Sequence, residues 1–312
     1  MNQFRNRELI VVTGKGGVGR TTLSAAIGVA AASAGNRTVI CEVSGQQNIP
    51  AAFGVAAQPL GSETALGPNL ASITIDPDTA LQEWIRAQAG AAVGRALGAS
   101  RSFAHFVAAA PGAREMVTIT KAWELGPGRR WGRGKVEHDL VVLDAPASGH
   151  GTAMLTAPRT FADIAGSGPV KEQSERVWDL LTDPIRSMLV AVTTLAELPV
   201  SETVELNSWL KEKLDRPLDL VVANRIGPPG FSRSEMNLIS SAVDSEALPS
   251  GAAKAAELNS ARASIESAHL AELQSGLDAQ TTVIRLPETS ADTESSVLVE
   301  QLAEQLTKSL PN

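Results

Sequence analysis

The sequence predicts an α/β protein, a doubly wound and mostly parallel sheet that carries a helical insertion. Short apolar runs without polar alternation are typical of parallel strands that are buried on both faces. These runs alternate with longer segments whose apolar residues recur at helical spacing. The insertion is indicated by a long stretch after residue 76 in which no strand-like run occurs before Asp139. The predicted strands comprise residues 8–13, 38–43, 70–76, 139–144, 188–194, 218–224 and 281–286.

The first elements show how this pattern is built. Residues 8–13, ELIVVT, form an apolar run that ends at glycines, and the helix expected over 20–34 carries Ala, Leu and Ile at helical spacing. Gly35 and Asn36 end that helix before the second strand begins. Two later helices are indicated by Leu206, Trp209, Leu210 and Leu214, and by Leu298, Val299, Leu302 and Leu306.

The predicted insertion differs in character from the rest of the chain. Its apolar residues between Leu81 and Leu97 fall on one helical face. A loop rich in glycine and arginine at 126–134 is expected to close it. The expected division is 1–77 with 136–312 for the α/β domain, 78–135 for the helical insertion, and 153–185 for helices packed beside it.

Composition excludes several classes of function. The chain has 27 basic and 34 acidic side chains, and this acidic excess disfavours nucleic acid or an acidic membrane surface as the main partner. The single cysteine, Cys41, can form neither an intrachain disulfide nor a CxxC metal site. No apolar stretch approaches the roughly 18 residues of a membrane span, and the run at 9–12 is too short for a signal peptide. We therefore expect a cytoplasmic protein without stable membrane insertion.

A glycine-rich loop follows the first predicted strand and opens the first predicted helix. Residues 14–21, GKGGVGRT, fit the pattern G-x-x-x-x-G-[K]-[ST], with Arg20 in place of the usual lysine. Glycines let successive backbone N–H groups point at phosphate oxygens, and the helix N-terminus adds the positive end of its dipole. Thr21 offers a hydroxyl to Mg²⁺. Because the loop lies between a strand and a helix, a glycine turn without a ligand is the weaker interpretation, and a phosphate site is predicted.

Two positive charges of this loop need separate interpretation. Arg20 keeps a charge near the β- and γ-phosphates, but its planar fork differs from the compact ammonium of lysine. Small misplacements of a catalytic group lower the rate steeply, so nucleotide binding with weakened catalysis is expected. Lys15 stands second in the loop, an unusual place for a charge in an ordinary phosphate loop. From the residues alone, it is either a solvated lysine or a functional one.

The segment GKGGVGRTT resembles the deviant Walker motif G-K-G-G-x-G-K-[ST] of a group of dimeric ATPases. Residues 144–150, DAPASGH, resemble the switch II sequence D-x-A-P-T-G-H of the arsenite-pump ATPases and of the GET-pathway ATPases that deliver tail-anchored proteins. The similarity covers most of the chain, including residues 37–54, and within these the segment 41–54, CEVSGQQNIPAAFG, is closest to a bacterial branch with paired paralogs. It implies an ATP-binding ATPase that works as a homodimer, or as a heterodimer with a paralog, on an unidentified client protein.

The resemblance also implies roles for individual residues. Lys15 would reach across the dimer to the γ-phosphate of the other subunit, and Asp144 would hold the Mg²⁺ shell and couple switch II to the phosphate. Asn224 would contact the adenine edge and Pro287 would lie in the loop over the base, although both also suit an ordinary strand end or loop. The expected catalytic residues are Lys15, Arg20 and Asp144, and the expected Mg²⁺ residues are Thr21 and Asp144. The expected ATP or ADP site comprises Gly14, Lys15, Gly16, Gly17, Val18, Gly19, Arg20, Thr21, Thr22, Asn224 and Pro287.

Two departures from the family's pattern concern catalysis and metals. Alignment on Phe53 and Gly54 places Ser44 where the family has an acid that orients the attacking water, and Gln47 where it has a histidine. Neither side chain is a good base near pH 7, and general-base help is worth roughly 10²–10⁴-fold. Glu42 is an acid upstream of this position that can point elsewhere. The zinc-binding and metalloid-binding cysteines of the family are missing, so neither site is expected.

These observations favour a nucleotide-switched dimeric ATPase that is slow on its own. A nucleotide-binding regulatory subunit with negligible hydrolysis, acting with an active paralog, stays open because Arg20 and Ser44 weaken the site. Single-turnover hydrolysis would separate the two. A membrane-positioning ATPase is disfavoured, since the segment after Pro287 is acidic and not basic.

Overall fold

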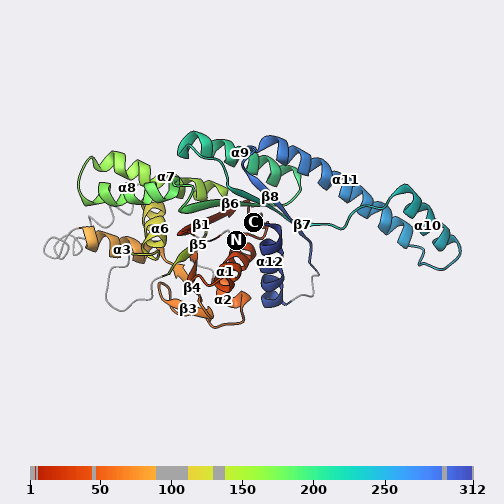
Figure 1. Cartoon of the computed structure of the whole chain (residues 1–312), viewed down its shortest axis with the longest axis horizontal. Coiled ribbons are helices and arrows are strands. Elements are labelled where there is room, and N and C mark those ends of the chain that lie inside the picture. Colours follow the sequence, from red (N-terminus) through yellow and green to blue (C-terminus); the bar gives the residue numbers. More distant parts are fainter. Residues whose placement is uncertain are drawn as a thin grey trace.

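A computed structural model describes Phe4 and residues 6–43, 47–88, 112–128, 138–289 and 294–310. Within these residues, one eight-stranded sheet lies between two layers of helices (Figure 1). The strands are β1 (Leu9–Gly14), β2 (Thr38–Val43), β3 (Glu63–Gly67), β4 (Leu70–Ile75), β5 (Leu140–Asp144), β6 (Ser187–Thr193), β7 (Leu220–Ile226) and β8 (Thr282–Pro287).

The order of the strands across the sheet is β3-β4-β2-β5-β1-β6-β7-β8. Every neighbouring pair is parallel except β3 with β4 at one edge. The predicted doubly wound, mostly parallel α/β fold is therefore confirmed, and each predicted strand lies within two residues of its expected bounds. The exception is β3, which was not predicted. Its sequence, ETALG, is poor in the β-branched and aromatic residues that indicate strands.

The described helices connect the strands and cover both faces of the sheet. They are α1 (Arg20–Ser33), α2 (Asn48–Ala52), α3 (Pro77–Gln88), α6 (Ala113–Glu124), α7 (Ser148–Ala165), α8 (Pro169–Thr182), α9 (Glu197–Leu214), α10 (Arg233–Asp244), α11 (Ala252–Gly276) and α12 (Ser295–Ser309).

Side chains of the central strand β1 alternate between the two apolar layers. Leu9 and Val11 join the cluster beneath α3, α6, α7, α8 and α9, whereas Ile10 and Val12 join the cluster beneath α1 and α12. All four are at most 1% exposed. β1 is hydrogen-bonded to β5 as far as Val12 and to β6 as far as Gly14, so the strand that leads into the loop is held from both sides.

The helix that follows the glycine-rich loop is supported by the most C-terminal described helix. α12 packs along α1, and its Leu302 and Leu306 share one buried cluster with Leu23 and Ile27 of α1. A Cβ on Gly28 would lie 2.5 Å from Ile40 Cδ1, so α1 also approaches β2 closely. α1 is therefore held between the sheet and α12.

The predicted insertion at 78–135 includes α6 and nearly all of α3, and its residues 89–111 and 129–135 lie outside the described part. α6 packs against α3 and α7, and α7 packs against α8. Trp84 Nε1 donates a hydrogen bond to Gln173 Oε1 at 3.0 Å, which joins α3 to α8. The limits of the insertion as a domain stay a prediction.

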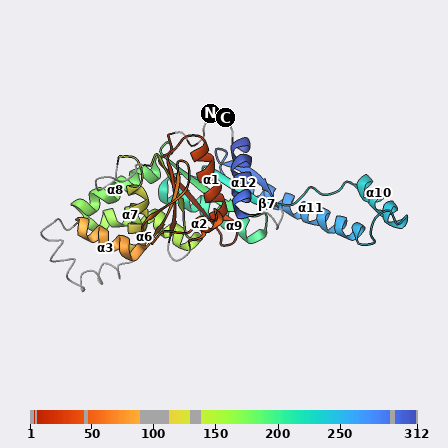
Figure 2. The same cartoon turned by 90° about the horizontal axis from the view of Figure 1, so that it is seen from below.

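A pair of helices projects from the sheet between β7 and β8 (Figures 1 and 2). We call residues 233–276, which form α10 and α11, the arm. α10 has no buried residue, and α11 has only Ala256 and Leu273 buried. Leu273 belongs to the same cluster as α9, so the arm is anchored near its C-terminal end. The sequence pattern predicted neither of these helices.

Candidate functional site

The glycine-rich loop lies at the carboxyl end of the central strand, directly before α1. Gly14 ends β1 with a φ of 139°, and a Cβ there would lie 2.2 Å from the carbonyl oxygen of Val192 in β6. Gly19 has a φ of 97°, and a Cβ there would lie 2.5 Å from Asn224 Nδ2. Both positions therefore require glycine, for conformation and for space. The result is a loop of backbone N–H groups at a helix N-terminus, the arrangement that binds phosphate.

Asp144 joins this loop to the neighbouring strand β5. Its Oδ2 accepts a hydrogen bond from Thr21 Oγ1 at 2.6 Å, and its Oδ1 accepts one from Ser24 Oγ at 3.3 Å. Burial raises the pKa of Asp144, while the Thr21 hydrogen bond and the positive charge of Arg20 oppose this shift. Hydroxyl and carboxylate oxygens are ligands that suit Mg²⁺. Thr21 and Asp144 therefore fit the ion that the sequence predicts beside the phosphates.

The two positive charges of the loop contact different neighbours. Arg20 Nη1 donates a hydrogen bond to the carbonyl oxygen of Ala145, the residue after Asp144. Lys15 Nζ forms an ion pair with Glu202 Oε1 on α9. Arg20 therefore lies toward the start of the expected switch II, and Lys15 lies on the opposite flank of the loop.

Asn224 and Arg225, near the end of β7, donate hydrogen bonds to backbone carbonyl oxygens of the loop. Asn224, which is 7% exposed, donates from Nδ2 to the carbonyl oxygen of Val18 at 2.8 Å. Arg225 Nη1 donates to the carbonyl oxygen of Gly17 at 3.2 Å. Pro287 is the last residue of β8 and lies opposite Ile226. The expected contacts of Asn224 and Pro287 with a base stay predictions.

Glu42 accepts hydrogen bonds from backbone N–H groups at the start of α2. Its two carboxylate oxygens accept hydrogen bonds from the N–H groups of Asn48 at 2.9 Å and Ile49 at 3.1 Å, at the start of α2. It also lies opposite Asp144 in the pairing of β2 with β5. Burial raises the pKa of Glu42 to about 7, and the nearby Asp144 charge adds to this, against the two backbone hydrogen bonds. Ser44 lies outside the described residues.

Within the described residues, no three or more His, Cys, Asp or Glu side chains are grouped so that they could hold a metal ion. Cys41 is buried in the middle of β2. No described helix has both the length and the apolar character needed to cross a bilayer.

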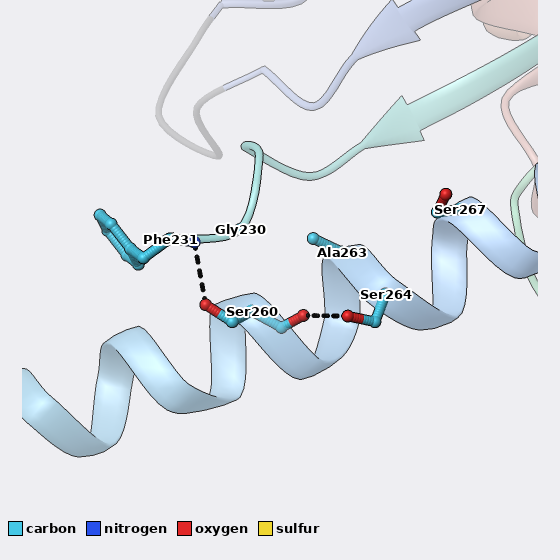
Figure 3. Close-up of a pocket in the computed structure, with 6 residues that line it drawn as sticks. All are labelled: Gly230, Phe231, Ser260, Ala263, Ser264 and Ser267. Atoms are coloured by element: carbon cyan, nitrogen blue, oxygen red, sulfur yellow. Dashed lines mark hydrogen bonds between the residues drawn. The ribbon is translucent and has the colours of Figure 1, made fainter. Parts of the chain in front are cut away.

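A pocket of about 450 Å³ lies between residues 230–231 and α11 of the arm (Figure 3). The N–H group of Phe231 donates to Ser260 Oγ at 3.0 Å, and the Phe231 ring points away from α11. None of the lining residues is titratable, so the pocket offers no acid, base or charge for chemistry. Its lining residues are Gly230, Phe231, Ser260, Ala263, Ser264 and Ser267.

Three residues at the site were missed by sequence reasoning. Ser24 stands three positions after Thr21 on α1, so helical spacing alone could have placed it on the same face. Arg225 adjoins Asn224 and could have been included with it. Glu202 has no such signal, because it is an ordinary charged residue of an amphipathic helix far along the chain.

The fold and this site together define a class of protein. A glycine loop on the carboxyl end of a central parallel strand opens a helix, and an acid at the end of the next strand faces its threonine. This combination is that of the P-loop nucleotide-binding proteins.

A comparison with protein families narrows the class. Residues 7–167 match the model of the anion-transporting ATPases, and the chain belongs to this family. The match includes the glycine-rich loop and Asp144, whereas Glu202, Asn224 and Arg225 lie beyond it.

Curated relatives agree with this assignment. The ATPase BagA of Mycobacterium tuberculosis is 31% identical over 223 residues, which are 70% of this chain and 64% of that protein. A protein of Prosthecochloris vibrioformis, provisionally named arsenical pump-driving ATPase, is 26% identical over 219 residues, 69% of this chain and 51% of that protein. The chain thus spans less than two thirds of the length of these relatives.

Proposed function

We propose that this chain binds Mg-ATP on residues 14–21, hydrolyses it slowly, and changes conformation with the nucleotide as a dimer with itself or with a related chain. Family membership supports nucleotide binding and ATP hydrolysis. The finer parts of the proposal, which are the dimer, the slow rate and the use of Mg²⁺, are supported by individual residues.

The observation that carries the proposal is the contact of 2.6 Å between Thr21 Oγ1 and Asp144 Oδ2. It joins Thr21 in the first turn of α1 to Asp144, the first residue of the DAPASGH segment. A group bound at this point contacts Thr21 and Asp144 at once, so its binding or loss affects both α1 and the segment that begins at Asp144. Bound Mg²⁺ would neutralise negative charge on the β- and γ-phosphate oxygens.

The chain's own groups then have distinct tasks. The backbone N–H groups of residues 16–21 bind and orient the phosphates, because the glycine conformations turn them inward. Asp144, largely desolvated beside Thr21, holds the ion that accompanies them. Lys15 is the residue proposed to meet the γ-phosphate of the facing subunit, where positive charge stabilises developing negative charge.

Two side chains, Arg20 and Ser44, are the reasons for proposing that hydrolysis is slow. Arg20 donates to the carbonyl oxygen of Ala145, so its guanidinium is engaged beside Asp144, and its planar fork differs from the ammonium of lysine. Ser44 provides no carboxylate to orient water, and Glu42 is occupied by the N–H groups of α2. Neither the Ser44 hydroxyl nor the Glu42 carboxylate therefore supplies a free general base.

Two measurements test this proposal. Titration calorimetry with Mg-ATP should show binding, and single-turnover hydrolysis by the purified chain should be far below about 10 s⁻¹, a median enzyme rate. The double variant Arg20→Lys with Ser44→Asp should raise turnover by at least about tenfold. Arg233→Lys on the exposed arm is the matched control and should change nothing. Absence of ATP binding by folded protein, or a wild-type rate near the median, would contradict the proposal.

A nucleotide-binding regulatory subunit is the second candidate, and the engagement of Arg20 with Ala145 favours it. Such a chain would bind ATP without measurable turnover and would act on an active paralog. Single-turnover hydrolysis by the purified chain distinguishes the candidates, and a mixture of this chain with a paralog tests the regulatory function. The regulatory function predicts that the mixture hydrolyses faster than either protein, and that Lys15→Ala removes this gain without preventing assembly.

A further inference from the structure

Lys15 is held on its own subunit by Glu202. Glu202 lies in the second turn of α9, which follows β6, and β6 pairs with β1 so that Val192 lies opposite Gly14. This pairing brings the first turns of α9 beside the residue that follows Gly14. The side chains of Lys15 and Glu202 are each 33% exposed, so the ion pair is partly shielded from water.

The carboxylate of Glu202 is only half satisfied. Oε1 contacts Lys15, whereas Oε2 is buried and has no hydrogen-bond partner among the described residues. A buried carboxylate oxygen without a donor is unfavourable, because it has lost water without gaining a replacement. Lys15 is therefore the group that compensates this carboxylate in the described structure. Loss of Lys15 would leave both oxygens without that compensation.

A lysine is suited to leave such a contact. Its ammonium is a compact charge on a flexible four-carbon stem, and one ammonium can exchange one anionic partner for another. A γ-phosphate carries more negative charge than a carboxylate, so it can compete for the same ammonium. The ion pair with Glu202 therefore stabilises the present position of the Lys15 side chain relative to every other position.

We propose that Glu202 is a positioning residue that holds Lys15 in the nucleotide-free chain and releases it to phosphate. The anchor itself needs only the observed ion pair. The release step rests on the proposed function, because it takes from it the phosphate of the facing subunit as the second partner. Glu202 thereby sets how much ATP is needed before the two subunits join.

The anchor is tested by lysine labelling in the absence of nucleotide. An amine-acetylating reagent and mass spectrometry give the labelling rate of Lys15, with the exposed Lys254, whose side chain is 71% exposed, as internal reference. Glu202→Gln should raise the Lys15 rate by about threefold to tenfold, because the charge that holds the ammonium is gone. Glu202→Asp should recover part of the protection. Glu205→Gln, an exposed change one turn along α9, is the matched control and should leave the rate unchanged.

The release step is tested by sedimentation against Mg-ATP concentration. Glu202→Gln should lower the ATP concentration for half-maximal dimer by about threefold to tenfold, and this gain should vanish in a Lys15→Ala background. Equal labelling of Lys15 in Glu202→Gln and Glu205→Gln would overturn the anchor. Faster labelling with an unchanged ATP midpoint would overturn the release step.

Different results refute the proposed function and the anchoring of Lys15 by Glu202. If wild type and all variants do not bind ATP, the proposed function and the release step are both refuted, while labelling still decides the anchor. Circular dichroism and melting temperature establish that each variant is folded. If Glu202→Gln does not fold, Glu202→Asp gives the same decision, since a shorter side chain must loosen the contact and raise the Lys15 labelling rate.

Discussion

The glycine-rich loop and the arm both follow the carboxyl end of a strand in the same sheet, but they are held in place differently. Side chains from three other elements contact the loop and the start of α1, namely Asp144 of β5, Asn224 of β7 and Glu202 of α9. In the arm, α10 buries no residue and α11 buries only Ala256 and Leu273. The loop therefore depends on distant parts of the chain, and most of the arm does not.

Local hydrogen bonds stabilise the start of the arm, where few residues are buried. Ser232 and Glu235 form a capping box, in which each side chain accepts a hydrogen bond from the other's backbone at the start of α10. Such bonds need no sheet. We therefore expect the outer arm to open at a lower free energy than the strands that carry the loop.

The largest expected effect tests whether the loop is fixed by the sheet. Gly14→Ala places a Cβ 2.2 Å from the carbonyl oxygen of Val192, in a left-handed conformation, and should lower the free energy of unfolding by on the order of 3–5 kcal/mol. Gly16→Ala is the control, since a Cβ there meets nothing within 4 Å, and it should cost about 1 kcal/mol or less. Urea unfolding measures both. Equal losses would show that the sheet does not constrain the loop.

The next effect locates the boundary between arm and body. Leu273→Ala removes a fully buried side chain at the anchored end of α11 and should lower the free energy of unfolding by about 2–4 kcal/mol. Leu258→Ala changes the same residue type in the same helix where it is 61% exposed, and should stay within about 0.5 kcal/mol of wild type. If Leu258→Ala cost as much as Leu273→Ala, the outer arm would be packed against something and the contrast would be wrong.

The smallest effect is a pH dependence confined to the loop end of the sheet. The pKa of Glu42 is raised from 4.5 to about 7, so between these values the folded chain binds a proton that the unfolded chain has released. The free energy of unfolding should therefore fall as the pH rises from about 4.5 to about 7, by roughly 2–3 kcal/mol for this group.

Urea unfolding of wild type and Glu42→Gln across this pH range checks the prediction. The variant should lose most of the slope and keep a smaller part from Asp144, whose pKa is raised in the same direction. Glu257→Gln on the arm is the control and should retain the wild-type slope. A slope that survives Glu42→Gln unchanged would place the titrating group elsewhere.

The sequence predicted what depends on local pattern. Strands such as LIVVTG are apolar throughout because both faces are covered, and the glycine spacing of residues 14–19 reflects backbone conformations that only glycine adopts readily. The whole parallel part of the sheet and the position of the loop followed from these signals. The edge strand β3 did not, because an exposed edge needs no apolar run.

The remaining misses have a physical reason of their own. α11 is rich in alanine and serine and buries only Ala256 and Leu273. Its sequence therefore lacks the regular spacing of apolar residues that indicates an amphipathic helix. At the site, the ion pair of Lys15 with Glu202 and the hydrogen bond of Val18 with Asn224 join residues far apart in the chain. Spacing along the sequence carries no record of such contacts, since strand order decides them.

The packing of α12 along α1 has a consequence for how the site forms during synthesis. The loop and α1 emerge from the ribosome early, whereas Leu302 and Leu306, which cover α1, are among the last described residues to be made. Until then, one face of α1 lacks its apolar partner. The phosphate site therefore lacks this support until α12 has been synthesised and has docked on α1.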